Sequence, residues 1–232
     1  MTGHIRVLMG AVGVACATGA ASAFIPWTPY PAMGDSFTHF DGGSDLGAAG
    51  FGVPTVLADE FSFAPTQFTA NAAAGSSASY NDRLEVFIDA NTILDDIVVI
   101  ETGTITGDVA GGNLSGGNDA LFTVVGDVDI VANWNGFFPA AFSELLDVSV
   151  QVVDANTAKW TAIRTFDLSA GPDTFFQDVT EAILILENVI TARSFGGTGT
   201  TVTKDSVQIF VPAPAGLAAM GMGLALAGRR RR

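Results

Sequence analysis

Apolar residues in the middle of this chain recur mostly at every second position, and that spacing limits what the chain can fold into. A period of two places successive side chains on opposite faces of a β-strand, so one face is buried while the other meets water. The pattern is clearest at residues 84–88, 124–130, 148–152 and 207–211. Runs rich in β-branched and aromatic residues predict four further strands, at 56–63, 97–106, 160–166 and 182–191.

Segments rich in glycine and asparagine separate several of these strands, at 41–52, 74–79, 111–119 and 196–199. Many strands without alternating long helices predict an all-β fold, an antiparallel β-sandwich of jelly-roll-like type. Two short helices are also predicted, at 139–145 and 174–180.

The N-terminal segment has the organisation of a secretory signal peptide. A basic start is followed by small and apolar residues at 7–17, and Ala21 and Ala23 supply the small side chains that a signal peptidase requires. We therefore expect cleavage before Phe24 and a signal helix ahead of it. Lipidation at Cys16 is the alternative at this end of the chain.

The C-terminal segment combines a proline-rich break, an apolar run and a basic end. In order, it consists of the break Val211, Pro212, Ala213 and Pro214, the apolar run 215–228, and the end Arg229, Arg230, Arg231 and Arg232. A helix of that run spans about 21 Å, which is short of the ~30 Å hydrocarbon core of a bilayer. Because arginine clusters stay on the cytoplasmic side, the segment predicts a weak membrane anchor that leaves the body outside.

This tail resembles the PEP-CTERM sorting signal, in which a short Pro-x-Pro motif precedes a small apolar helix and terminal arginines. The resemblance implies maturation by an exosortase, a membrane cysteine protease-transpeptidase, and delivery to the cell surface or the exopolysaccharide matrix. The usual motif is Val-Pro-Glu-Pro, whereas this chain has Ala213 in place of the glutamate. The resemblance covers about a tenth of the chain and concerns sorting alone.

These features divide the chain into four segments. They are a signal peptide (1–23), an extended lead-in rich in proline and aromatic residues (24–35), a β-sandwich domain (36–210) and a sorting segment (211–232). Five basic residues and all 24 acids lie between residues 24 and 210, so the mature body carries a formal charge of 5 − 24 = −19. Such a body repels phosphate backbones, which argues against nucleic-acid binding.

Calcium is the metal that the loops would suit, because carboxylate and amide oxygens in glycine-rich turns are its usual ligands. The candidate ligands fall in two loops and are Asp41, Asp45, Asp108, Asn118 and Asp119. The second loop looks like part of one calcium-binding nonapeptide, but only one copy is present. Ordinary turns between strands are the simpler interpretation, and no other cofactor is expected.

Catalytic groups are scarce in the mature segment. It has one histidine, His39, and no cysteine, so His-and-Cys zinc sites and a cysteine nucleophile are excluded. A packed or surface histidine is the simpler interpretation of His39. Glycoside hydrolysis would need two carboxylates facing one cleft, and the adjacent pairs 59–60 and 95–96 point to opposite faces if they lie on strands.

Aromatic side chains offer a possible sugar-binding face. Trp134 and Trp160 are the candidates, with Phe137 and Phe138 close in sequence. Exposed aromatic rings stack on carbohydrates, but tryptophan in a sandwich more often belongs to the core.

The sequence therefore predicts a non-enzymatic cell-surface or matrix protein of structural or interaction type. Its expected partners are a signal peptidase, an exosortase, the inner membrane during maturation, and exopolysaccharide. Two alternatives stay open, a carbohydrate- or calcium-dependent adhesion module and a carboxylate-based hydrolase.

Overall fold

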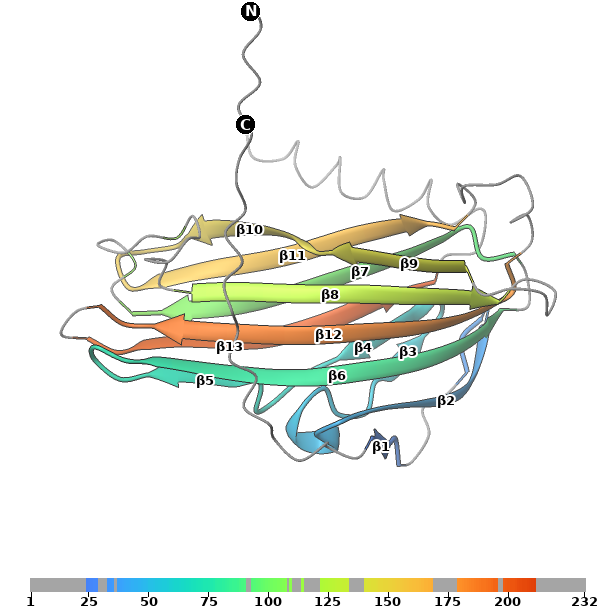
Figure 1. Ribbon diagram of the computed structural model, residues 1–232, viewed down its shortest axis with the longest axis horizontal. Coiled ribbons are helices and arrows are strands. Elements are labelled where there is room, and N and C mark those ends of the chain that lie inside the picture. Colours follow the sequence, from blue (N-terminus) through green and yellow to red (C-terminus); the bar gives the residue numbers. More distant parts are fainter. Residues whose placement is uncertain are drawn as a thin grey trace, which may run out of the picture.

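The computed structural model describes residues 24–28, 33–35, 37–90, 93–107, 109, 114, 122–133, 140–168, 179–195 and 198–211. The structural statements below concern these residues. They form strands, turns and one short 3-10 helix, η1 (Gly47–Ala49), and the strands assemble into two antiparallel sheets (Figure 1). The predicted all-β class and its antiparallel sheets are confirmed.

The first sheet has six strands. Their spatial order is β1 (Ile25–Pro26), β2 (Phe37–Ser44), β6 (Ser77–Ala90), β12 (Glu181–Arg193), β8 (Phe122–Asn133) and β9 (Ala140–Leu145). Its centre is β12, which pairs along nearly its whole length with β6 on one side and β8 on the other.

The second sheet has seven strands. Six of them lie in the order β10 (Asp147–Val152), β11 (Thr157–Asp167), β7 (Asp96–Thr106), β13 (Thr200–Phe210), β4 (Glu60–Phe63) and β3 (Thr55–Leu57), and β5 (Thr69–Ala72) also pairs with β13. From β6 onward, the connections β6 to β7, β7 to β8, β9 to β10, β11 to β12 and β12 to β13 each cross from one sheet to the other.

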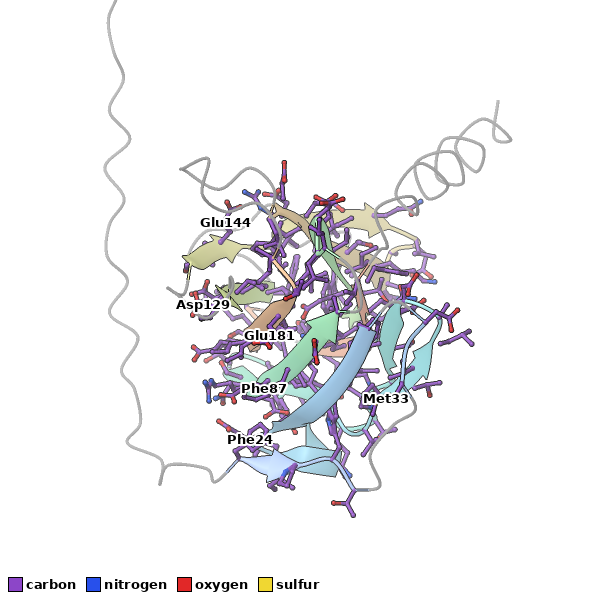
Figure 2. All side chains as sticks on the ribbon, turned by 90° about the vertical axis from the view of Figure 1, so that its right-hand side faces the viewer. Phe24, Met33, Phe87, Asp129, Glu144 and Glu181 are labelled. Atoms are coloured by element: carbon purple, nitrogen blue, oxygen red, sulfur yellow. The ribbon has the colours of Figure 1, made fainter. Side chains whose placement is uncertain are left out.

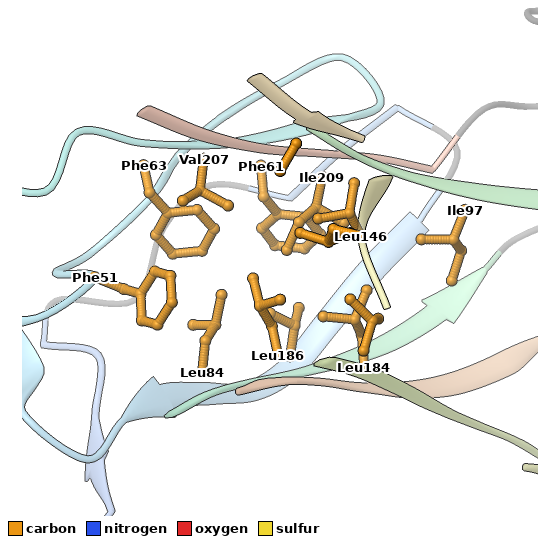
Figure 3. Close-up of a cluster of buried hydrophobic side chains, with 14 of the residues drawn as sticks. Phe51, Phe61, Phe63, Leu84, Ile97, Leu146, Leu184, Leu186, Val207 and Ile209 are labelled. Carbon is orange, nitrogen blue, oxygen red and sulfur yellow. The ribbon is translucent and has the colours of Figure 1, made fainter. Parts of the chain in front are cut away.

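The core lies between the two sheets and consists of the apolar positions of the alternating pattern. Figure 3 shows side chains of the first sheet, among them Leu84 and Leu186, facing Phe63, Val207 and Ile209 of the second. All five are at most 1 % exposed. Burying a side chain of this kind stabilises the fold by about 1.5–3 kcal/mol, so the period of two determines which face of each strand turns inward.

Two buried side chains close the flanks of the sandwich. Leu146 lies between β9 and β10, where the chain passes from the first sheet to the second within one residue, and its backbone N–H donates to Gly126 O at 2.9 Å. On the other flank Trp27 packs against Phe61 and Phe63, with ring centroids 6.2 and 6.0 Å away. Residues of the predicted lead-in therefore contribute both a short strand, β1, and a core side chain.

The predicted strands are present, with different limits. The predicted strand 56–63 is a hairpin of β3 and β4, and its turn contains Ala58 with a φ of 51°. The predicted joint 74–79 is shorter than expected, because β6 begins at Ser77. Along β10, at the edge of its sheet, only Val150 packs against the core as expected, because Val148 and Val152 are 40 % and 56 % exposed.

The predicted helix at 139–145 is wrong, because Ala140–Leu145 form strand β9. This segment pairs antiparallel with residues 127–132 of β8. The free hydrogen-bonding edge of β8 satisfies the backbone of a short segment in strand form, whereas a two-turn helix would leave most of its terminal groups without partners. Of the second predicted helix, residues 174–178 lie outside the described residues, and Val179 and Thr180 are not helical.

Candidate functional site at the centre of the sandwich

Four polar side chains lie inside the apolar core, two from each sheet. Asp82 on β6 and Asn188 on β12 come from the first sheet, and Glu101 on β7 and Lys204 on β13 come from the second. Their exposed fractions are 4, 1, 0 and 1 % in that order. Charged groups are almost never buried this deeply unless they have partners, so their arrangement is informative.

One oxygen joins three of these residues. Glu101 Oε1 lies 2.9 Å from Lys204 Nζ and accepts a hydrogen bond of 2.6 Å from Asn188 Nδ2. Beyond the ion pair, Lys204 Nζ has no hydrogen-bond partner among the described residues, and neither do Glu101 Oε2 and Asn188 Oδ1. The amine, the carboxylate and the carboxamide thus meet between the two sheets, and each has an atom that could make a further hydrogen bond.

Burial disfavours the charged form of Lys204, whereas the nearest aromatic rings and carboxylates favour it. Its Nζ lies 4.5 Å from the ring centroid of Phe68 and 5.1 Å from that of Phe51. Burial lowers the pKa of Lys204 below its ordinary value, and the nearby Glu101 and Asp82 carboxylates oppose that shift. The result is a buried amine held between aromatic rings and a carboxylate.

A β-bulge in β13 directs Lys204 into the core. The pairing of β13 with β7 matches Lys204 to Gly103 and Ser206 to Thr102, so Asp205 is the extra residue. Before the bulge the even-numbered positions, such as Val202 and Lys204, are buried, and after it the odd-numbered Val207 and Ile209 are buried.

Two glycines on the strands paired with Lys204 and Asn188 leave room for the side chains of Trp160 and Leu146. Gly103 lies opposite Lys204, and Gly126 lies opposite Asn188 in the β12–β8 pairing. A Cβ on Gly103 would approach Trp160 Cε2 to 2.3 Å, and one on Gly126 would approach Leu146 Cδ1 to 2.5 Å.

Asp82 binds the backbone of the loop that carries η1. Its Oδ1 accepts from the N–H groups of Leu46 at 3.0 Å and Arg83 at 2.9 Å, and its Oδ2 accepts from Phe51 N–H at 3.0 Å. These bonds favour the carboxylate, but desolvation is the larger effect and raises the pKa of Asp82 above its ordinary value. Asp82 therefore positions Phe51, one of the two rings against Lys204.

Of the five predicted calcium ligands, only Asp45 has a described side chain. Asp45 is half-buried, and its backbone N–H donates to Arg83 O at 3.0 Å. The backbone of Asp41 belongs to β2, but its side chain lies outside the described set, as do Asp108, Asn118 and Asp119 altogether. Within the described ranges, no three His, Cys, Asp or Glu side chains gather closely enough to hold a metal.

Trp160, one of the two predicted sugar-binding tryptophans, lies in the core. It is fully buried, and its Nε1–H donates to Thr203 O at 3.1 Å. A ring without exposed surface cannot stack on a sugar, so the simpler interpretation of Trp160, a core side chain, is confirmed and the alternative role as a sugar platform is excluded. Trp134, Phe137 and Phe138 lie outside the described residues.

The acidic pairs considered for hydrolysis lie on different elements. Glu60 accepts a hydrogen bond of 2.8 Å from Gln208 Nε2. Asp96 lies opposite Asp167 in the β11–β7 pairing, and its pKa is raised first by burial and then by the charges of Asp167 and Asp95. The side chain of His39 lies outside the described set.

The predicted processing residues lie mostly beyond the described ranges, namely Ala21, Ala23, Pro212, Ala213, Pro214, Arg229, Arg230, Arg231 and Arg232. Phe24 is half-buried at the start of the described chain. Val211 is fully buried, and its N–H donates to Asp59 O at 2.8 Å, so it packs with the sandwich. No helix in the part of the chain that the structure describes is long and apolar enough to cross a membrane.

Reasoning from the sequence missed the buried cluster, although its signal was readable. Glu101 occupies an inward position between Val99 and Gly103, and Asn188 occupies one between Leu186 and Ile190. A polar residue on the apolar phase of an alternating strand indicates a buried polar group that needs a partner.

Comparison with known proteins gives little further information. No family model and no curated protein matches the sequence. Among solved structures, the chain is similar to one in the cryo-EM atomic structure of Broad Bean Stain Virus, with 10% identity, 63% of this chain and 84% of that chain covered, and a TM-score of 0.19. A chain from the structure of infectious bursal disease virus Gt strain has 10% identity, coverage of 63% and 41%, and a TM-score of 0.13. At TM-scores this low, the similarity indicates neither the fold nor the function of this chain.

Proposed function

We propose that this chain is an exported cell-surface or extracellular-matrix protein of structural or interaction type. A signal peptide ending at Ala23 and a sorting tail starting near Pro212 direct it there, with an exosortase and exopolysaccharide as its partners. The jelly-roll-like arrangement of the strands and the calcium sites remain predictions from the sequence.

The burial of the polar cluster carries the non-enzymatic part of the proposal. Asp82, Glu101, Asn188 and Lys204 are at most 4 % exposed. A soluble substrate cannot reach these groups without opening the sandwich, so their chemistry serves the fold itself. The outer face of the first sheet carries polar and charged side chains, such as Glu181 and Asp129, both labelled in Figure 2.

The limits of the fold support the sorting part of the proposal. The described strands begin at Ile25 and end at Phe210, so they all lie between the two predicted processing segments. Removal of residues 1–23 and of residues after Val211 would leave every described strand in place.

The proposal is tested by following the exported chain in cell fractions. We expect the full chain to fractionate with the cell envelope or matrix, and a chain truncated after Val211 to be released into the medium. The truncation keeps Val211, because that side chain is buried and its loss would confuse sorting with folding. Substitution of Pro212 and Pro214 by alanine is the control that alters the motif but keeps the apolar run and the arginines. Equal retention of the full and truncated chains would show that the tail does not sort the protein.

A further inference from the structure

We propose that Lys204 and Asn188 condense into an intramolecular isopeptide bond, with Glu101 transferring the protons, and that this bond joins the two sheets covalently. The inference rests on the buried cluster alone and does not depend on where the protein is delivered.

The reacting groups are already assembled. Lys204 Nζ and Asn188 Nδ2 are both within hydrogen-bonding distance of Glu101 Oε1, at 2.9 and 2.6 Å, so the amine and the carboxamide are neighbours. The amine comes from the second sheet and the carboxamide from the first. Reaction within a folded core converts a slow encounter of two weak reactants into a unimolecular step, which is the largest advantage that positioning offers.

The environment activates the amine. A lysine is nucleophilic only as the neutral amine, and a desolvated site favours that form. Lys204 is 1 % exposed, so water does not stabilise its ammonium form. Burial lowers the pKa of Lys204, and the adjacent carboxylate of Glu101 is the base that takes its proton.

The reaction balances without an oxidant, a reductant or a cofactor. Lys204 Nζ gives one proton to Glu101 and attacks Cγ of Asn188, forming the new C–N bond and placing charge on Oδ1. The Cγ–Nδ2 bond then breaks. Nζ loses its second proton and Nδ2 gains one, so Nδ2 leaves as ammonia. The remaining proton stays on Glu101 or departs with the ammonia as ammonium. Glu101 is suited to this transfer because its Oε1 contacts both nitrogens.

The position of the bond gives it a mechanical use. Lys204 lies on β13, the last described strand, and Asn188 lies on β12 in the other sheet. A pull on the chain end beyond β13 would pass through the bond to β12, which pairs with both β6 and β8 at the centre of its sheet. Neither strand could then separate from the other sheet without breaking a covalent bond.

The test is the mass of the purified full chain and of its tryptic peptides. We expect a mass lower than that of the processed sequence by about 17 Da, the mass of ammonia. Trypsin should fail to cleave after Lys204, and the peptide 165–193 should be found joined to the peptide that begins at Ser194. Peptide mapping is needed because a cyclised Asn135–Gly136 would lose the same mass, but it would leave Lys204 cleavable.

Variants separate the roles of the three residues. Glu101→Gln and Lys204→Met should both have the mass calculated for their processed sequences, because no cross-link forms. Asn188→Asp should lose about 18 Da, because the same reaction releases water instead of ammonia. Lys159→Met removes an exposed lysine and is the matched control that should keep the cross-link. Circular dichroism shows which variants fold.

The wild-type measurement decides the proposal even if a variant fails to fold. Cleavage after Lys204, with the Asn188 peptide recovered separately at full mass, would overturn it and leave the cluster as a buried ion pair. A cross-link that persists in Glu101→Gln would overturn the role given to Glu101.

Discussion

Oδ2 of Asp82 occupies the space in which a side chain on Gly50 would begin, since a Cβ built on Gly50 lies 1.6 Å from that oxygen. The carboxylate reaches this position because it accepts a hydrogen bond of 3.0 Å from Phe51 N–H, the next residue along the loop. Gly50 thus lets the loop close over a buried charge, and the loop in turn places Phe51 against Lys204.

Gly50→Ala should destabilise the fold by about 3 kcal/mol, because the loop must move away from Asp82 and lose the Phe51 hydrogen bond. Urea unfolding measures the effect. Gly75→Asn is the control, since Gly75 lies in a turn with nothing within 4 Å of its Cβ position and a φ of 71° that asparagine tolerates. It should cost less than about 1 kcal/mol. Equal losses at the two glycines would contradict the role given to the Asp82 contact.

Asp82→Asn should lower stability at neutral pH by about 1–3 kcal/mol, because an amide nitrogen cannot accept the N–H groups that the carboxylate binds. Burial raises the pKa of Asp82 in the folded state, so the folded chain binds more protons than the unfolded chain between that raised value and the ordinary 3.8. The contribution of this group to stability therefore grows as the pH falls through that window.

The pH dependence is checked by urea unfolding of wild type and Asp82→Asn between about pH 4 and pH 8. Other acids titrate in both proteins, so the difference between the two curves isolates Asp82. We expect the stability of the wild type, relative to the variant, to increase toward the acid end. A difference that shrinks on acidification would mean that hydrogen bonding, not desolvation, dominates at Asp82.

Trp160→Ala should cost about 3–5 kcal/mol, because a fully buried ring would leave a cavity. Trp160→Phe keeps most of the packing but leaves Thr203 O without its donor, and should cost about 1–3 kcal/mol. Phe195→Ala is the aromatic control, since Phe195 is 61 % exposed and should change stability by less than about 0.5 kcal/mol. Thermal melts of the three variants give the order, and a mild Trp160→Ala would argue against this packing.

Arg164→Met should have a small effect, although Arg164 links two acids at the flank of the sandwich. It contacts Glu144 on β9 and, at 3.1 Å, Asp147 on β10. These side chains are 33, 43 and 77 % exposed, so solvent screens the pair and we expect a loss of at most about 1 kcal/mol. The loss should shrink further in high salt. A loss above about 2 kcal/mol that persists in high salt would show that this contact is a structural clamp.

Alternation in the sequence was sufficient to find most strands and their buried faces. The alternating apolar residues that the pattern assigns to the core in β6, β8 and β13 are buried there, because a half-buried strand must repeat every two residues. It failed at β9, where six residues have too little periodicity to separate strand from helix and the edge of β8 decided the outcome.

The candidate site was present in the sequence only as exceptions to that pattern. Glu101 and Asn188 interrupt apolar faces, which indicates burial but not a partner. Their meeting depends on residues 87 positions apart in the chain, and no local rule specifies that separation. The bulge at Asp205 decided it further, because without the extra residue β13 could not bury both Lys204 and Val207.

The sequence by itself determined the period of the strands, the buried faces of β6, β8 and β13 and the charge of the body, since each follows from local composition. Only the tertiary structure decided which strands face each other. Stacking β12 of one sheet over β7 and β13 of the other brought the carboxamide of Asn188 and the amine of Lys204 to one carboxylate oxygen of Glu101. The physical reason is that burial of apolar faces is non-directional, whereas the contacts of buried polar groups depend on sheet order and register.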